Sequence, residues 1–235
     1  PYTSFIQVRG LIMSLAIVIP AYNTQSSLDR VLGEIPDHLR SGVIVIDDGS
    51  DTPIHADDVR LIRHPENRGY GAAQKTGYDA AIEMGAERVV LLHGDGQYAT
   101  GDVLGLNDAL AACDAAIGSR FLNQGAAHMP MWRRWGNRVL TFMANARYGS
   151  DLSELHSGAR GFRVSTLKKV DYHRFSDDYI FDHQMWATLL SQGVSIGERK
   201  VHCAYDESVQ SIAIAPSIKY AVGVMRTIIR PPPAG

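Results

Sequence analysis

Two adjacent carboxylates are the first residues of this sequence that could bind a ligand. Asp47 and Asp48 stand in the run Asp-Asp-Gly-Ser, where both side chains can accept hydrogen bonds from a nucleobase or a ribose. Gly49, the next residue, allows the backbone to turn tightly. Aspartate, glycine and serine are also common in simple turns, so a purely structural role is the alternative.

A third carboxylate has surroundings that suit a metal ion. Asp95 lies between two glycines in the run His93-Gly94-Asp95-Gly96-Gln97, so it can approach a diphosphate with little steric obstruction. Mg²⁺ binds few protein carboxylates and takes waters and phosphates as its other ligands. His93 precedes Asp95 by two residues, which places both side chains on one side of an extended strand. His93 is therefore either a metal ligand, which would favour Mn²⁺, or a residue that packs.

A glycine-containing segment precedes a predicted helix. Gly69 and Gly71, in the run Asn-Arg-Gly-Tyr-Gly, can bring backbone N–H groups close to an anion at the start of that helix. Gln74 stands where a dinucleotide-binding motif would have its third glycine, and the Gly-Lys-Ser/Thr ending of a phosphate-binding loop is missing. We therefore expect this segment to shape a loop beside a nucleotide.

Apolar runs and helical periodicity alternate along the first half of the chain. The apolar runs predict buried strands at residues 15–19, 43–46, 61–62, 89–92 and 115–117, and the periodicity predicts helices at residues 28–35, 72–84 and 103–112. This alternation predicts an α/β fold with a mostly parallel central sheet and helices on both faces. The runs Ala21-Tyr22-Asn23, Asp47–Ser50 and His93–Gln97 each follow a strand, so they should gather at the carboxyl edge of the sheet.

The second half of the chain contains three helical apolar stripes, over residues 132–143, 181–190 and 218–229. We expect all three to pack in the core, because an apolar helix face usually points inward. The last stripe could instead lie on a membrane surface or against a partner, since basic residues stand off its apolar face.

Composition and charge exclude several classes of protein. Apolar residues make up 45% and charged residues 20% of the 235 residues, which is ordinary for a globular chain. The formal net charge of −2 argues against a nucleic-acid partner held by bulk electrostatics. Cys113 and Cys203 fit no metal or disulfide pattern, which suits a reducing compartment. No apolar run approaches the ~20 residues of a membrane span, so we expect a cytoplasmic protein that can lie at the inner face of the membrane.

Several segments together resemble a known family. Val18–Asn23, Ile46–Ser50, Asn67–Gly69 and Gly94–Tyr98 are similar, in order and spacing, to the family 2 glycosyltransferases, which have a GT-A fold. Gly118-Ser119-Arg120-Phe121 and Ser157–Phe162 are similar to segments of the polyprenyl-phosphate (dolichol-phosphate) mannose or glucose synthases. The resemblance covers roughly residues 14–205. It implies an N-terminal extension at 1–13 and one GT-A domain at 14–235, with a nucleotide-sugar half at 14–120 and an acceptor half at 121–235.

The resemblance also implies roles for individual residues. The nucleotide-sugar would bind to Pro20, Ala21, Tyr22, Asn23, Asp47, Asp48, Gly69, Gly94, Asp95 and Gln97. A divalent metal, Mn²⁺ or Mg²⁺, would bind to Asp95 and Gln97, with His93 as a further candidate. The acceptor phosphate would bind to Arg120, Arg133 and Arg134, and the residues of catalysis would be Asp95, Arg120 and Asp182.

Two of these assignments keep alternatives. The family usually has Asp-x-Asp where this chain has His93-Gly94-Asp95, so His93 could also mean weaker use of metal. Asp182 could instead be a favourable charge at a helix N-terminus, and Asp177 and Asp178 are rival carboxylates.

The implied reaction is the inverting transfer of a sugar from a nucleotide-diphosphate sugar of the GDP-mannose or UDP-glucose type, in the synthesis of a cell-envelope glycan. An acceptor phosphate, here that of a polyprenyl lipid at a membrane surface, needs cations more than a base, because a phosphate monoester is largely dianionic at pH 7. A hydroxyl acceptor would need a base, and Asp182 is the candidate. The alternatives are a soluble transferase to a glycan or small-molecule hydroxyl, and a nucleotide-binding homologue without catalysis. Self-association into a homo-oligomer is open.

Overall fold

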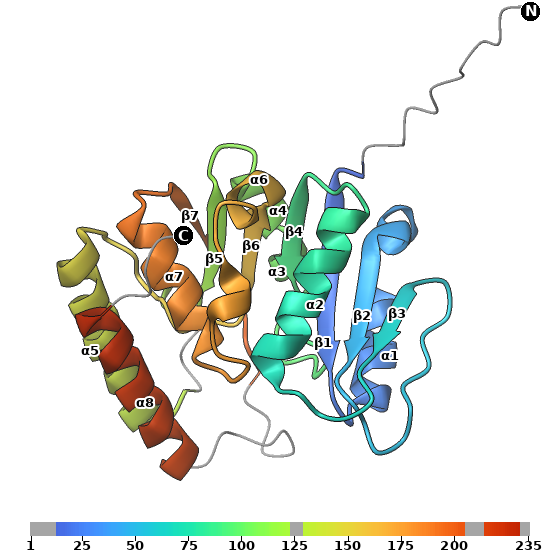
Figure 1. Ribbon diagram of the computed structural model, residues 1–235, viewed down its shortest axis with the longest axis horizontal. Coiled ribbons are helices and arrows are strands. Elements are labelled where there is room, and N and C mark those ends of the chain that lie inside the picture. The colour runs from blue at the N-terminus through green and yellow to red at the C-terminus, as the bar shows by residue number, and fades with distance from the viewer. Residues whose placement is uncertain (1–12, 123–128, 205–213, 231–235) are drawn as a thin grey trace, which may run out of the picture.

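One twisted sheet forms the centre of the molecule (Figure 1). The structure is a computed structural model that describes residues 13–122, 129–204 and 214–230. Within those residues the sheet has seven strands in the order β3-β2-β1-β4-β6-β5-β7. The strands are β1 (Leu15–Ala21), β2 (Val43–Asp47), β3 (Arg60–Arg63), β4 (Arg88–Leu91), β5 (Ala115–Ser119), β6 (Arg160–Arg163) and β7 (Ile196–Lys200).

The central strands form where the chain has continuous apolar runs. β1 pairs in parallel with both β2 and β4, and all of β2 is buried. Alternate residues face opposite sides, so Val18 packs in one hydrophobic cluster while Ile17 and Ile19 pack in the other. A strand that is buried on both faces has no polar side, which is why β1 and β2 were recognisable as apolar runs.

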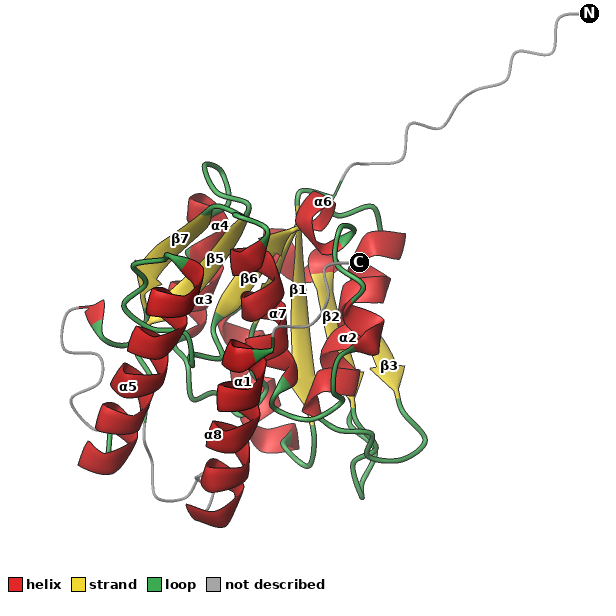
Figure 2. Ribbon diagram, turned by 60° about the vertical axis from the view of Figure 1, so that its left-hand side comes forward, coloured by secondary structure: helices red, strands yellow, loops and turns green. Residues whose placement is uncertain are grey.

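Helices cover both faces of this sheet (Figure 2). The described helices are α1 (Gln25–Glu34), α2 (Tyr70–Glu83), α3 (Thr100–Leu104), α4 (Leu106–Ala109), α5 (Met131–Tyr148), α6 (Val164–Leu167), α7 (Phe181–Ser191) and α8 (Ile214–Ile229), with 3₁₀ turns at Asp37–Gly42 and Tyr172–Arg174. Side chains of α1, α3 and α4 pack on one face, and those of α2, α6 and α7 pack on the other. The predicted α/β fold with a mostly parallel sheet is confirmed.

Strand β6 breaks the parallel order. It runs antiparallel to both β4 and β5, whereas β5 and β7 pair in parallel. Two reversals leave β5 pointing the same way as β1 and β4, so the ends of β1, β2, β4 and β5 share one carboxyl edge. Neither β6 nor β7 was predicted, because both contain charged residues and lack an apolar run. The predicted helix at 103–112 is in fact two short helices, α3 and α4, which meet at Gly105.

The prediction that the stripe at 132–143 packs in the core is wrong. In α5 the side chains of Trp132, Trp135, Val139 and Phe142 are all exposed, and the buried residues of the helix are Thr141 and Ala144. The stripe at 181–190 does pack in the core, through Phe181, Met185, Trp186 and Leu189 of α7. The third stripe is divided, since Ile228 of α8 is buried while Val222 and Ile229 are exposed.

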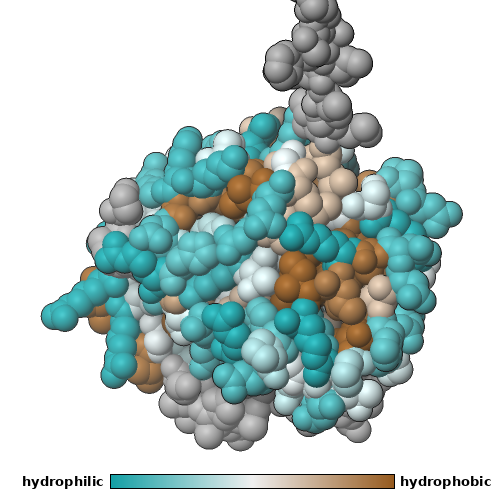
Figure 3. All heavy atoms as spheres, turned by 45° about the vertical axis from the view of Figure 1, so that its right-hand side comes forward, coloured by the Kyte–Doolittle hydropathy of each residue, from teal (hydrophilic) through white to brown (hydrophobic). Residues whose placement is uncertain are grey.

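The outer surface is otherwise mixed in character. Figure 3 shows hydrophilic side chains around smaller apolar patches on the face that it turns to the viewer. None of the helices within the described residues is both long enough and apolar enough to cross a bilayer. The N-terminal extension expected at 1–13 lies outside the described residues except for Met13.

Candidate active site

The loops that follow β1 and β2 are fastened to each other at the carboxyl edge. The Asp48 N–H donates to the Ala21 carbonyl at 2.9 Å. The Asn23 N–H donates to Ser50 Oγ, and the Asn23 side chain exchanges two hydrogen bonds of 2.9 Å with Asp51. The two polar segments predicted to meet at this edge therefore do meet there. Tyr22, the middle residue of the first of these segments, keeps an exposed side chain.

Asp48 holds the glycine-containing loop in place. Its buried carboxylate accepts hydrogen bonds from the backbone N–H groups of Arg68, at 3.1 Å, and Gly69, at 2.9 Å. His64 Nδ1 lies 2.6 Å from the same carboxylate, and His64 Nε2 lies 2.9 Å from Thr76 Oγ1. Asp48 thus positions the 66–69 loop directly beside the β1 and β2 loops.

The start of α2 is capped by the chain itself. The N–H groups of Gly71 and Ala72 both donate to the Asp177 carbonyl, at 2.7 and 3.3 Å. Gly69 has a φ of +104°, and a Cβ there would lie 2.5 Å from that carbonyl oxygen. The glycine is therefore needed for this close approach, and these two N–H groups are occupied within the chain.

Asp47 is committed to the turn that follows β2. It is fully buried and accepts hydrogen bonds from the backbone N–H groups of Ser50, at 2.9 Å, and Ile54, at 3.2 Å. Arg63 also contacts its carboxylate. Burial would raise the pKa of Asp47, but the hydrogen bonds from Ser50 and Ile54 and the charge of Arg63 lower it overall. Asp47 therefore stabilises the turn that follows β2.

A stack of aromatic rings borders Asp95. The Tyr70 hydroxyl lies 2.7 Å from His93 Nε2, and the Tyr70 ring stacks on both His93 and Tyr179 with centroids 5.6 and 5.2 Å away. The Asp95 charge acts on both His93 and Tyr179, so the carboxylate lies near these rings. Burial lowers the pKa of His93, which keeps the imidazole neutral. The Gln97 N–H donates to Asp95 Oδ1 at 2.9 Å.

The donor set here fits a metal ion that takes most of its ligands from substrate and water. Among the described residues, no three His, Cys, Asp or Glu side chains come together as a metal cage. Asp95 is a half-buried carboxylate at the end of a strand, and one or two carboxylates plus substrate phosphates are the usual Mg²⁺ arrangement. His93 fits less well, because its Nε2 is engaged by Tyr70 and its Nδ1 is buried without a hydrogen-bond partner.

Asp182 lies at the centre of a buried polar network. It is in the first turn of α7, accepts a hydrogen bond of 2.7 Å from Gln74 Nε2, and forms an ion pair of 2.8 Å with Arg160. Tyr78 in turn donates to Gln74 Oε1 at 2.8 Å. Burial raises the pKa of Asp182, although the charge of Arg160 opposes that shift. Asp182 and His93 interact electrostatically, so this network adjoins the aromatic stack.

Arg120 lies at the end of β5 and is paired with a buried acid. Its Nε donates to Glu154 Oε1 at 2.9 Å, its backbone N–H donates to Glu154 Oε2 at 2.8 Å, and its Nη2 also contacts that carboxylate. Glu154 has no exposed surface. Arg133 and Arg134 are instead half-buried residues in the first turn of α5, and the Arg133 guanidinium lies 5.0 Å from the centre of the Trp132 ring. Arg120 thus has a buried acid as its partner, whereas Arg133 lies against an aromatic ring of its own helix.

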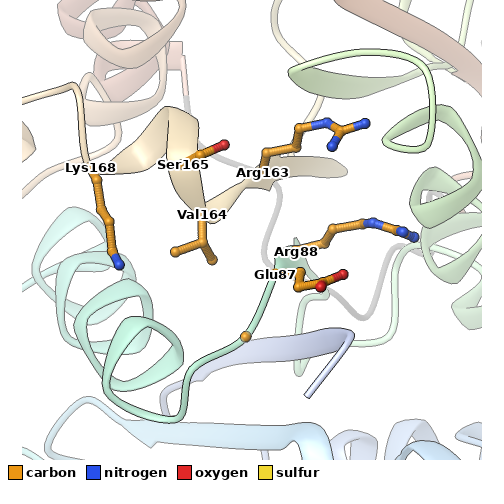
Figure 4. Close-up of a pocket in the computed structure, with 7 residues that line it drawn as sticks. Glu87, Arg88, Arg163, Val164, Ser165 and Lys168 are labelled. Carbon is orange, nitrogen blue, oxygen red and sulfur yellow. The ribbon is translucent and has the colours of Figure 1, made fainter. Parts of the chain in front are cut away.

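A pocket of about 430 Å³ lies at the opposite edge of the sheet (Figure 4). It is lined by Arg88 at the start of β4 and Arg163 at the end of β6, with Val164, Ser165 and Lys168 close by. These are the amino ends of the parallel strands, so this pocket is separate from the residues described above.

Comparison with known proteins identifies the family. The sequence pattern of glycosyl transferase family 2 matches residues 16–171, which is most of the chain. The chain belongs to glycosyl transferase family 2. It is a glycosyltransferase, as the resemblance of its motifs implied.

Two curated relatives of this glycosyltransferase have described activities. One is the UDP-N-acetylglucosamine–dolichyl-phosphate N-acetylglucosaminyltransferase of Methanococcus voltae, which is 26% identical over 81% of this chain and 86% of that protein. The other is the polyprenol monophosphomannose synthase of Mycolicibacterium smegmatis, which is 29% identical over 77% of this chain and 74% of that protein.

Solved structures confirm the GT-A fold. Glucosyl-3-phosphoglycerate synthase from Mycobacterium tuberculosis, solved with UDP, superposes with a TM-score of 0.69 at 16% identity and covers 95% of this chain and 82% of its own. Another structure of that enzyme, with Mn²⁺, UDP and glucosyl-3-phosphoglycerate, has a TM-score of 0.66 at 14% identity. At this identity the likeness concerns the fold alone.

Several residues of this glycosyltransferase site had no role in the sequence prediction. Tyr70, Gln74, Glu154 and Arg160 come from elements far apart in the sequence, and each matters through a partner that only the fold supplies. Arg160 gave one usable signal, since a charged residue between Ala159 and Gly161 in an otherwise small and apolar segment is unusual.

Proposed function

We propose that this glycosyltransferase moves a sugar from a nucleotide-diphosphate sugar to the phosphate of a polyprenyl phosphate, with inversion at the anomeric carbon. The observation that carries this proposal is the convergence of the Tyr22, Asp48 and Asp95 segments at one sheet edge. The two relatives described above, named for dolichyl-phosphate and polyprenol acceptors, support the choice of acceptor.

The donor would lie across the loops that follow β1, β2 and β4. The exposed Tyr22 ring is available to stack on the base, with Pro20, Ala21 and Asn23 beside it. Asp48 and Gly69 would form the ribose wall, since the carboxylate already holds the loop there, and Asp47 would support that wall from inside its turn. Gly94, Asp95 and Gln97 would lie at the diphosphate.

A divalent ion, Mn²⁺ or Mg²⁺, would be held by Asp95, with Gln97 and His93 as candidate neighbours. When bound, such an ion neutralises charge on the leaving diphosphate. His93 would have to give up the Tyr70 hydroxyl to contribute, so we expect Asp95→Ala to abolish metal-dependent donor binding and His93→Ala to weaken it less. Titration of Mn²⁺ in the presence of a nucleoside diphosphate measures both effects.

The acceptor oxygen attacks the anomeric carbon from the face opposite the diphosphate, and the nucleoside diphosphate leaves with the bonding electrons. Arg133 and Arg134 would attract the acceptor phosphate. Arg120 would contribute its positive charge from the end of β5, where its pair with Glu154 holds it. Asp182 would keep Arg160 and Gln74 in position near the reacting groups. Because the acceptor is a lipid, the protein would work at the cytoplasmic face of a membrane.

Transfer assays with a panel of donors test this proposal. UDP-N-acetylglucosamine, UDP-glucose and GDP-mannose are each offered with a short-chain, water-soluble polyprenyl phosphate, and the anomer formed is identified by NMR. We expect transfer from one donor with inversion. Arg133→Gln with Arg134→Gln should raise the acceptor KM and leave the donor KM unchanged. An equal loss of donor affinity would place these arginines at the donor instead.

A hydroxyl acceptor is the alternative, and a specific observation favours testing it. Asp182 is a buried carboxyl whose raised pKa would suit a general base. If free sugars accept the glycosyl group and the lipid phosphate does not, the proposed acceptor is wrong and Asp182 takes the role of the base. Absence of transfer and of donor hydrolysis, with nucleotide binding intact, would indicate a binding protein without catalysis.

A further inference from the structure

Helix α5 exposes an apolar face that the rest of the described chain leaves uncovered. Trp132 is 51% exposed, Trp135 61% and Phe142 72%, and Met131 and Val139 are exposed as well. At 100° per residue these five residues fall within an arc of about 100°, and Ala146 is the only other residue in that arc. Large contiguous apolar patches are rare on soluble monomers and mark interaction sites.

The charges of α5 indicate what kind of partner covers this face. The helix contains Arg133, Arg134, Arg138 and Arg147 and no acidic residue. On the helical wheel Arg134 and Arg138 flank one side of the apolar arc and Arg147 stands beyond the other. Tryptophan at the apolar boundary together with flanking arginine is the composition of helices that lie in the interface of an anionic membrane.

Helix α5 also lies close to the proposed site. The Arg138 guanidinium stands 5.3 Å from the centre of the Phe121 ring, and Phe121 follows the carboxyl end of β5. Helix α8 packs along α5, as Figures 1 and 2 both show, and the Tyr148 hydroxyl donates to the Thr227 carbonyl at 3.2 Å. Two exposed apolar residues of α8, Val222 and Ile229, are seven apart and so share one face of that helix.

We propose that the apolar face of α5, comprising Met131, Trp132, Trp135, Val139 and Phe142, docks into the interface of an anionic lipid membrane. This inference goes with the proposed function, since a lipid-borne acceptor has to be met at such a surface. Docking would bring Arg134, which flanks the apolar arc, to the level of the lipid headgroups, where an acceptor phosphate lies. Opposite charge on the bilayer distinguishes it from a second copy of this chain, whose α5 would repel its partner with four arginines of its own.

Vesicle flotation tests the docking directly. The full chain is mixed with vesicles of phosphatidylcholine alone or of equal parts phosphatidylcholine and phosphatidylglycerol, without polyprenyl phosphate and without donor. We expect the protein to float with the anionic vesicles and to be released by high salt. The variant Trp132→Ser, Trp135→Ser, Phe142→Ser should bind at least about tenfold more weakly because it loses its buried aromatic surface.

The arginines are tested separately. Arg138→Gln with Arg147→Gln should weaken binding to anionic vesicles by roughly fivefold for each charge removed and leave binding to phosphatidylcholine unchanged. Leu61→Ser is the matched control, because Leu61 is an exposed apolar residue on the distant edge strand β3. All variants should unfold at the temperature of the parent, since each replaced side chain is exposed.

Failure of wild-type protein to bind anionic vesicles, or equal binding by the triple serine variant, would overturn the inference. So would a dimer in light scattering that the triple variant dissociates, because a second copy would then cover the face. Transfer to a short-chain, water-soluble acceptor reports on the proposed function alone. If the wild-type protein binds anionic vesicles but does not transfer a sugar to that acceptor, the proposed function is refuted and the docking stands.

Discussion

Removing one partner of the buried Arg120–Glu154 pair should destabilise the protein strongly. In Arg120→Gln the Glu154 carboxylate stays fully buried and keeps the backbone N–H of residue 120, but it loses the guanidinium that neutralises it. Breaking a buried ion pair in this way costs about 3–5 kcal/mol, because a buried charge is left uncompensated. The cost should be at the upper end, since Glu154 has no exposed surface through which water could solvate it.

Urea unfolding measures this loss. With a slope of about 3 kcal/mol/M for a chain of this size, the midpoint should fall by at least about 1 M. Arg120→Met with Glu154→Met should recover much of the loss, because an apolar pair leaves no buried charge. The control is Arg199→Gln, whose exposed pair with Asp108 spans 3.6 Å and should change stability by less than about 1 kcal/mol.

The reasoning fails if Arg120→Gln unfolds at the same urea concentration as the parent. If its acceptor KM also rises while its stability is unchanged, Arg120 acts on the substrate rather than on Glu154. A loss of stability that the double variant does not repair would show that packing around residue 120, and not charge compensation, is what matters.

Further predictions concern His183, the glycines at 158 and 33, and Asp48. Burial lowers the pKa of His183 to about 4, whereas a histidine in the unfolded chain has a pKa of about 6.5. As pH falls below 6.5 the unfolded chain therefore takes up a proton before the folded chain does, and the free energy of unfolding should drop by about 3 kcal/mol between pH 6.5 and pH 4. His183→Leu should flatten that dependence in urea titrations. A Cβ at residue 158 would lie 2.4 Å from the His93 ring, so Gly158→Ala should displace that ring. A Cβ at residue 33 would have no atom within 4 Å, so Gly33→Ala should raise the unfolding temperature slightly. Asp48→Asn should weaken nucleotide binding in calorimetry, and unchanged affinity would mean that the donor pocket lies elsewhere.

The first half of the fold could be predicted because its strands are buried on both faces. β1, β2 and β4 then consist almost entirely of apolar residues, and their ends are marked by polar runs. β6 could not be predicted in the same way. It begins with Arg160, a buried charge that donates hydrogen bonds to the Ser157 and Gly158 carbonyls and is compensated by Asp182 from another element. That compensation is a property of the fold, and no local pattern contains it.

Helix α5 shows a different limit of prediction from sequence. Its apolar periodicity correctly indicated a helix with one apolar face, but periodicity does not say what that face contacts. Trp135 and Phe142 lie in the same pattern as the buried residues of α7, yet they are exposed. The arginines that flank the stripe distinguish the two helices, since α7 contains no arginine or lysine. Charge beside an apolar stripe is therefore as informative as the stripe.

The carboxylates of the site divide according to what already binds them. Asp47, Asp48 and Asp182 are buried, and each is held by two or more groups of the chain. Asp95 differs, because it is half-buried and, among the described residues, its carboxylate accepts one hydrogen bond, from the Gln97 backbone N–H. A carboxylate that is fully engaged has little capacity left for a ligand, whereas Asp95 keeps an oxygen for one. Under the proposed function, the three engaged carboxylates would fix the loops around the donor, and a divalent ion held by Asp95 would neutralise charge on the diphosphate.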